Sequence, residues 1–360
     1  MEDVKENITT NSNRNYYIDF MRGLAIISVI LIHTAWHSGT KYVPEIVRNL
    51  TLLYEVPAFF FIAGWTYTYI KSDDKYLKGL LKLQIRYSLY MLIVFVLILI
   101  SQKGTANIQN LWNWIFHNYS STYPLQSVQY SLWFMKTYFI TVLCSISIIR
   151  FCKKKTLIIC YILLILIVLQ TININNFNKI IIGLNVSLNY IIFYTFMFLL
   201  GYNLKDCKIG IKKFFMLTIA NIICLVIMKF LFKFDIMNIQ TNKYNTNLVY
   251  LLWSMFGIYI IVFLKQYLIN FKKDNIFVKL GQNSIYLYFA QGISSSLLYF
   301  ISGYIKINWY FKLPCMFIIN LIMAVTIMII LKFIIELIMN IPRYLYRIKE
   351  LRGKRYEKNF

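Results

Sequence analysis

Three ionisable side chains occur within one apolar run near the start of the chain: Asp19, Arg22 and His33. An ionisable group inside a membrane helix is costly, so its presence predicts a functional role. Asp19 and Arg22 are three residues apart, on one face of a helix, where they can pair. Arg22 and His33 are eleven residues apart, which is close to three turns and about 16 Å of rise. One helix is therefore expected to carry a cation near one end and an imidazole near the other, along a single stripe.

Glu55 precedes the next apolar run, at about the depth expected for His33. A carboxylate beside a histidine can orient the ring and raise its basicity. Each residue also has a simpler structural explanation. Arg22 can extend to the cytoplasmic headgroups, whereas His33 and Glu55 can be polar residues at the outer interface.

Two further cations lie at later apolar runs. Arg86 opens one run on the cytoplasmic side, where it either binds phosphate through its guanidinium group or belongs to the general positive charge of that side. Lys136 lies inside a run and requires a partner or a water-filled cavity. His37 and His117 are expected in outer segments, exposed to solvent.

The elements that position these residues follow from composition. Of 360 residues, 59% are hydrophobic and 14% charged, whereas a soluble domain carries about a quarter charged residues. Apolar runs of about twenty residues suit a bilayer core about 30 Å thick, and in lipid such runs form helices. The sequence predicts an all-α integral membrane protein, a bundle of about ten transmembrane helices. The runs are 17–36, 50–70, 83–100, 130–149, 156–172, 187–203, 214–232, 247–264, 283–303 and 313–341.

The net charge of +24 is distributed in short clusters between these runs, a pattern typical of a membrane protein rather than of a nucleic-acid-binding one. Alternate connections, together with both termini, carry 25 Lys and Arg, and the remaining connections carry 8. The positive-inside rule places the first set, including both termini, in the cytoplasm. The long outer segment 101–129 is rich in aromatics, which suit either an interfacial belt or a surface for stacking sugars.

The chain is expected to form one membrane domain, 17–341, between a cytoplasmic tail, 1–16, and a basic cytoplasmic tail, 342–360. The six cysteines have no CxxC or paired metal spacing, so neither a disulfide nor a metal site is expected. Residues 1–15 are polar and no cleavage-site pattern follows them, so the first apolar run is expected to remain as an anchor.

Several segments resemble those of the acyltransferase 3 family of membrane O-acyltransferases. Asp19 to Ala25 (DFMRGLA) followed by His33 resembles the family's Arg-x10-His signature, and Val56 to Trp65 (VPAFFFIAGW) is similar to its Pro-x-Phe-Phe-Phe-x-Ser-Gly segment. Later landmarks follow in the expected order and extend the resemblance from residue 19 to 291. They are Arg86, Trp133-Phe134, Lys243-Tyr244 and Gly281 to Tyr288.

The chain departs from the family pattern at four positions. Ala63 replaces a usual Ser, Glu55 stands where His is common, Asn245 replaces Pro and Gln291 replaces His. These departures concern substrate contacts and leave Arg22 and His33 unaffected.

The resemblance implies transfer of an acyl group, usually acetyl from cytoplasmic acetyl-coenzyme A, to a hydroxyl of a cell-surface glycan or its lipid-linked precursor. It places the protein in the plasma membrane as a multi-pass enzyme. Arg22, Arg86 and Asp19 are the candidates for the coenzyme A site. His33, oriented by Glu55, would act as general base or carry the acyl group itself. Candidates for substrate or oxyanion contacts are Trp133, Lys136, Asn283, Ser284 and Tyr286.

Two other classes of protein fit part of the sequence. A transporter or flippase for a lipid-linked or small polar substrate would also have buried Asp, Arg, His and Lys. Transporters often contain internal repeats, and none is evident here. A sensor or scaffold is the third class, but the short tails offer it no output domain. Dependence on coenzyme A separates the enzyme from both alternatives.

Overall fold

A computed structural model describes residues 15–38, 42–70, 72–101, 107–172, 181–182, 186–268 and 274–357. The expected N-terminal tail, apart from its last two residues, and the final residues 358–360 lie outside this described part of the chain.

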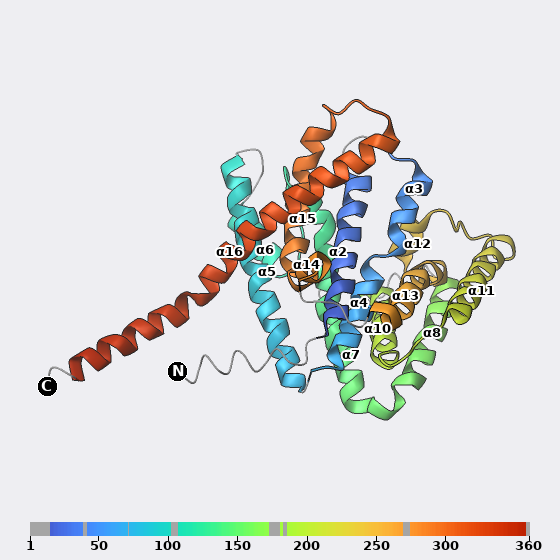
Figure 1. Ribbon diagram of the computed structural model, residues 1–360, viewed down its shortest axis with the longest axis horizontal. Coiled ribbons are helices and arrows are strands. Elements are labelled where there is room, and N and C mark those ends of the chain that lie inside the picture. Colours follow the sequence, from blue (N-terminus) through green and yellow to red (C-terminus); the bar gives the residue numbers. More distant parts are fainter. Residues whose placement is uncertain are drawn as a thin grey trace.

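The described chain is helical almost throughout (Figure 1). A two-stranded antiparallel hairpin pairs β1 (Ile181–Ile182) with β2 (Val186–Ser187), and Ile181 lies opposite Ser187. Short 3-10 turns occupy Thr51–Leu53 and Lys153–Lys155. The α-helices are α2 (Tyr16–His37), α3 (Glu45–Leu50), α4 (Val56–Tyr67), α5 (Asp73–Ser101), α6 (Ile108–Ile115), α7 (Gln126–Cys152), α8 (Thr156–Ile172), α10 (Leu188–Asn203), α11 (Ile211–Phe230), α12 (Ile239–Asn245), α13 (Leu248–Leu268), α14 (Ile276–Gln282), α15 (Ser284–Ser302) and α16 (Trp309–Glu357).

Each predicted apolar run overlaps a helix, which supports an all-α membrane protein. Within the described residues, seven helical segments are long and apolar enough to cross a membrane. One of them, Gln126–Ile172, contains both α7 and α8. The count of ten crossings and the orientation stay predictions. The last helix does not end near residue 341 but continues to Glu357, and Figure 1 shows it projecting away from the bundle.

The outer helices expose their apolar side chains. In α8, for example, Leu157, Ile158, Tyr161 and Ile165 are all more than half exposed. In the candidate spans formed by α5, α11 and α16, less than a third of the residues are buried within the protein. Exposed apolar surface on this scale requires another apolar phase around it, as the hydrocarbon of a bilayer provides.

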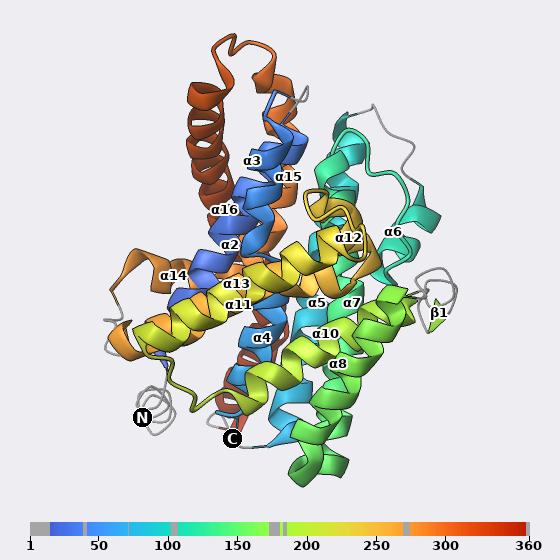
Figure 2. The same cartoon turned by 90° about the vertical axis from the view of Figure 1, so that its right-hand side faces the viewer.

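Helix α2 lies within the bundle, packed against α4, α14, α15 and α16 (Figures 1 and 2). Glycines allow two of the helix pairs to approach closely. Gly23 and Gly281 bring the backbones of α2 and α14 into contact, because a Cβ atom on either would overlap a carbonyl of the other helix. Gly64 on α4 and Gly201 on α10 do the same for that pair. Small residues commonly serve this purpose between membrane helices. The backbone that carries the ionisable residues of α2 is therefore held on several sides.

Candidate active site

Helix α2 presents Asp19, Arg22 and His33, as the sequence predicts. Asn15 caps its first turn, because its side-chain oxygen accepts a hydrogen bond from the backbone N–H of Tyr17. Asp19 is buried, and Arg22 Nη1 lies 3.6 Å from its Oδ1. The second guanidinium nitrogen, Nη2, donates a 2.8 Å hydrogen bond to Thr66 Oγ1 on α4. The guanidinium group is thus held in place while its side chain stays 30% exposed.

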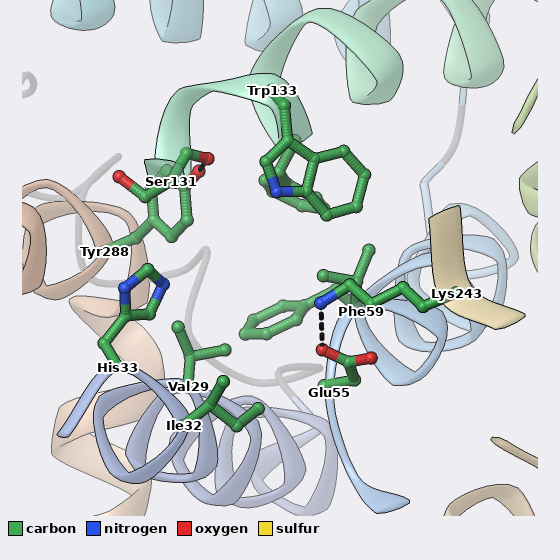
Figure 3. Close-up of a pocket in the computed structure, with 11 residues that line it drawn as sticks. Val29, Ile32, His33, Glu55, Phe59, Ser131, Trp133, Lys243 and Tyr288 are labelled. Atoms are coloured by element: carbon green, nitrogen blue, oxygen red, sulfur yellow. Dashed lines mark hydrogen bonds and ion pairs between the residues drawn. The ribbon is translucent and has the colours of Figure 1, made fainter. Parts of the chain in front are cut away.

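His33 lines a cavity of about 40 Å³ between α2, α4, α7, α12 and α15 (Figure 3). A cavity of this volume holds at least one water molecule, since one requires about 10–15 Å³. Its polar lining comprises His33, Glu55, Lys243, Ser131 and Tyr288. The remaining walls are apolar or aromatic: Val29, Ile32, Val56, Phe59, Trp133 and Phe134. A histidine that borders a small, mostly apolar cavity is well placed to act on a group inserted there.

Glu55 lines the same cavity as His33, but it is not hydrogen-bonded to it. Its Oε2 accepts a 2.6 Å hydrogen bond from Lys243 Nζ, and its Oε1 accepts one of 2.6 Å from the Tyr250 hydroxyl. The carboxylate therefore neutralises a buried lysine rather than orienting the histidine. The expected pairing of Glu55 with His33 is replaced by an ion pair whose partner is 188 residues away in the chain.

Lys243 reaches the cavity because α12 is tied to several other helices. Thr246 ends α12 in the left-handed conformation (φ 46°), which is strained for a β-branched residue. Gln170 Nε2 on α8 donates to the Thr246 carbonyl at 2.6 Å and holds this turn. The ammonium group of Lys243 also lies 5.4 Å from the centre of the Trp133 ring, within range of a cation–π interaction.

A second cavity, of about 160 Å³, surrounds the other end of the α2 stripe. Arg22, Ala63, Leu83, Ser284 and other residues line it. Phe59, Phe134 and Tyr288 line both this cavity and the one at His33. The two cavities therefore share a wall of three aromatic rings, and together they follow α2 from Arg22 to His33.

Arg86 lies outside both cavities. Its Nη2 is 2.9 Å from Glu336 Oε1 on α16, and its guanidinium group lies 5.5 Å from the centre of the Tyr286 ring. The Tyr286 hydroxyl donates to the same carboxylate oxygen. Asn283 accepts a 2.7 Å hydrogen bond from Lys332 Nζ, beside a groove of about 530 Å³ that Glu336 also lines. Arg86, Asn283 and Tyr286 thus gather at α16.

The predicted substrate and oxyanion residues lie at different places in the structure. Trp133 lines the His33 cavity, and Ser284 lines the Arg22 cavity. Asn283 and Tyr286 line neither, so the structure does not bring them to the histidine. The structure adds Ser131, Tyr288 and Lys243, which the sequence alone did not assign to the site. Lys243 and Tyr288 fall within the family-like segments 243–244 and 281–288, which was the only sequence signal for them. Ser131 had no such signal, because residue type does not show how deep in the membrane a side chain lies.

His117 is buried, contrary to the expectation that it is exposed to solvent. The segment that contains it folds back against α5, where Tyr87 and Gln84 contact the histidine. Its ring stacks on Tyr87 with 4.5 Å between centroids, and Nε2 lies 3.1 Å from Gln84 Oε1. Burial, with a smaller effect of the Lys136 charge, lowers the pKa of His117 to about 4. Lys136 lines neither cavity.

His37 is also not a freely solvated residue. It is partly buried, and its ring stacks on Tyr130 with 4.9 Å between centroids. The ring centroid lies 5.1 Å from that of His33. The two histidines thus stand one turn apart at the C-terminal end of α2.

Within the described residues, no three His, Cys, Asp or Glu side chains gather in a way that could hold a metal ion. All six cysteines are free. The polar side chains that line the His33 cavity can transfer protons and form hydrogen bonds.

The fold and the site together define a multi-pass membrane protein with a buried histidine at one end of a pair of adjoining cavities. A family model described as an acyltransferase domain matches residues 15–335. No curated protein and no solved structure matches the chain significantly. The chain belongs to the acyltransferase 3 family and is an acyltransferase, as its motifs predicted.

Proposed function

We propose that this protein transfers an acyl group, acetyl in the first instance, from acyl-coenzyme A to a hydroxyl of a cell-surface glycan or its lipid-linked precursor. The observation that carries the proposal is the pair of adjoining cavities along α2. Arg22 stands at one end and His33 at the other, separated by about 16 Å of helix. The thioester arm of coenzyme A is long enough to span such a distance while its anionic groups stay near the guanidinium.

Arg22 suits the coenzyme A phosphates, because a guanidinium group forms strong charge-assisted hydrogen bonds with them. Its bonds to Asp19 and Thr66 hold it at the cavity wall. Arg86, which is paired with Glu336, would have to exchange this partner to contact a phosphate. We therefore assign the donor site chiefly to Arg22 and keep Arg86 as a secondary candidate.

In the proposed reaction, His33 removes the proton from the acceptor hydroxyl as its oxygen attacks the thioester carbonyl carbon. The new C–O bond forms, the C–S bond breaks, and the proton passes from the imidazolium to the thiolate of coenzyme A. Ser131 and Tyr288 border the same cavity and lie near His33 (Figure 3). An acyl-His33 intermediate is a second route with the same overall balance.

We further propose that residues 17–341 form the catalytic membrane domain and that the chain lies in the plasma membrane with both termini in the cytoplasm. The alternation of 25 and 8 basic residues supports this orientation. It places Arg22 on the side of cytoplasmic acyl-coenzyme A and His33 near the outer side, where the acceptor glycan lies. A transporter or flippase would need no acyl donor, whereas this family is defined by acyl transfer.

The test is acetyl-coenzyme A turnover by the purified protein in liposomes with candidate glycan acceptors. We expect His33→Ala to lower kcat by about 10²–10⁴-fold, the usual contribution of a general base. Arg22→Ala is expected to raise the KM for acetyl-coenzyme A about tenfold, because a charge-assisted hydrogen bond contributes about 1.5 kcal/mol or more. His117→Asn, at a buried histidine outside both cavities, is the matched control. Full turnover by folded His33→Ala would reject the scheme.

A further inference from the structure

Gln291 is fully buried on α15, and neither its Oε1 nor its Nε2 has a hydrogen-bond partner among the described residues. It is the one amide side chain of the described chain for which both polar atoms are in this state. His33 Nδ1, on the neighbouring helix α2, is likewise buried and unpaired. Buried polar groups are nearly always hydrogen-bonded, so each of these two exceptions requires an explanation.

The position of Gln291 is fixed by its neighbours on α15. Tyr288, one turn earlier, lines the cavity beside His33 (Figure 3). Ser295, one turn later, accepts a 3.1 Å hydrogen bond from Asn320, which also donates at 2.9 Å to Thr34, the residue after His33. Helices α2 and α15 pack against each other. Gln291 therefore lies on a helix that packs against α2, between Tyr288, which lines the His33 cavity, and Ser295, which is linked through Asn320 to Thr34.

The other polar groups around His33 already have partners. Glu55 is bound by Lys243 and Tyr250, and the Tyr288 hydroxyl donates to the Ser131 carbonyl. His37 stacks on Tyr130. Among the described residues, Gln291 offers a buried amide oxygen on α15 that has no partner, and such an oxygen can accept a hydrogen bond from an imidazole N–H.

We propose that Gln291 is the positioning residue of His33: its Oε1 accepts a hydrogen bond from Nδ1–H and so leaves Nε2 unprotonated toward the cavity. The bond is not formed in this structure, so the proposal includes a change of side-chain torsions that forms it. Fixing one tautomer matters because only the unprotonated nitrogen can act as base. Gln291 would thus orient the His33 ring, the role that the sequence predicted for Glu55. This proposal rests on the proposed function of His33.

The tautomer can be measured directly by nitrogen-15 NMR on protein labelled at histidine, because the chain has only three histidines. We expect His33 in the wild type to be a single tautomer with the proton on Nδ1. Gln291→Leu, which removes the acceptor at similar volume, should give a mixture of tautomers. Asn221→Leu, at a buried amide that binds the Leu252 carbonyl between α11 and α13, is the matched control and should leave His33 unchanged.

Kinetics give a second readout. Gln291→Leu is expected to lower kcat about tenfold and leave the KM for acetyl-coenzyme A within twofold. Gln291→Glu keeps the acceptor, so it should retain kcat and move the acid limb of the pH–rate profile up by about one unit, because a carboxylate stabilises the imidazolium. The titratable and charged groups that face His33 are His37 on α2, Glu55 before α4, Lys243 on α12 and Tyr288 on α15, and both variants leave all four in place.

An unchanged His33 spectrum in Gln291→Leu would overturn the inference. If the leucine variant does not fold, an unshifted acid limb of the pH–rate profile in Gln291→Glu would overturn it instead. Retained turnover in His33→Ala would instead reject the proposed function, and the NMR result would still decide whether Gln291 binds His33. Loss of turnover in His33→Ala with no effect of Gln291 on spectrum or pH profile would reject the inference alone.

Discussion

Lys243 and Glu55 form the most deeply buried ion pair in the described part of the chain, with side-chain exposures of 10% and 2%. Removing two charges from water is costly, and their attraction offsets that cost only with good geometry and further hydrogen bonds. The 2.6 Å contact and the Tyr250 hydroxyl supply both. The pair also ties α12 to the start of α4, so it shapes one wall of the His33 cavity.

We expect Lys243→Met to destabilise the protein by about 3–5 kcal/mol, because it leaves the Glu55 carboxylate buried without its cation. The double variant Lys243→Met with Glu55→Gln should recover most of this loss. Arg86→Met, which breaks the more exposed pair with Glu336, is the control and should cost about 0–1 kcal/mol. Thermal unfolding in detergent measures all three. Equal losses in Lys243→Met and Arg86→Met would contradict the assignment of a buried pair.

At the scale of elements, the glycine contacts decide how closely the helices pack. Gly64 on α4 lies against the Phe198 carbonyl of α10, and Gly201 on α10 lies against the Phe61 carbonyl of α4. A backbone carbonyl cannot move aside as a flexible side chain can. Because α4 also carries Phe59 and Thr66, this contact positions both the shared cavity wall and a partner of Arg22.

Gly64→Ala is therefore expected to destabilise the protein by about 1–3 kcal/mol through overpacking. Gly79→Ala is the matched control, because no atom lies within 4 Å of a Cβ at that position on α5. That change should be neutral or stabilising by up to about 1 kcal/mol, since alanine favours a helix more than glycine does. The measurement is again thermal unfolding in detergent, and a similar shift for the two variants would exclude close packing as the cause.

For the whole molecule, the proposed mechanism requires a fixed orientation. The donor side must face the cytoplasm and the His33 end must lie near the acceptor. Lys154, between α7 and α8, and Lys306, between α15 and α16, are both exposed and belong to the two opposite sets of connections. They are therefore suitable reporters of orientation.

In a variant without the six native cysteines, we expect Lys306→Cys to react in intact cells with a maleimide that cannot cross membranes. Lys154→Cys should react only after the membrane is permeabilised. The physical reason is that positively charged connections are retained in the cytoplasm. Reaction of Lys154→Cys in intact cells would show the opposite orientation and would place Arg22 away from cytoplasmic acyl-coenzyme A.

The sequence by itself determined what depends on local structure. Apolar runs become helices because lipid leaves backbone groups no other partners, and each predicted run overlaps one. The stripe from Arg22 to His33 was predictable because both residues lie on one regular helix. The family followed from motifs whose order survives in the chain.

Only the tertiary structure decided which distant residues meet. Glu55 pairs with Lys243 across 188 residues, and the cavity walls come from five helices. His117 is buried because Tyr87 and Gln84 receive it, which its place in a polar connection does not reveal. Helix formation depends on residues that are near one another in the chain. The burial of a side chain and its hydrogen-bond or ion-pair partners depend instead on packing between elements. No short sequence pattern shows that packing.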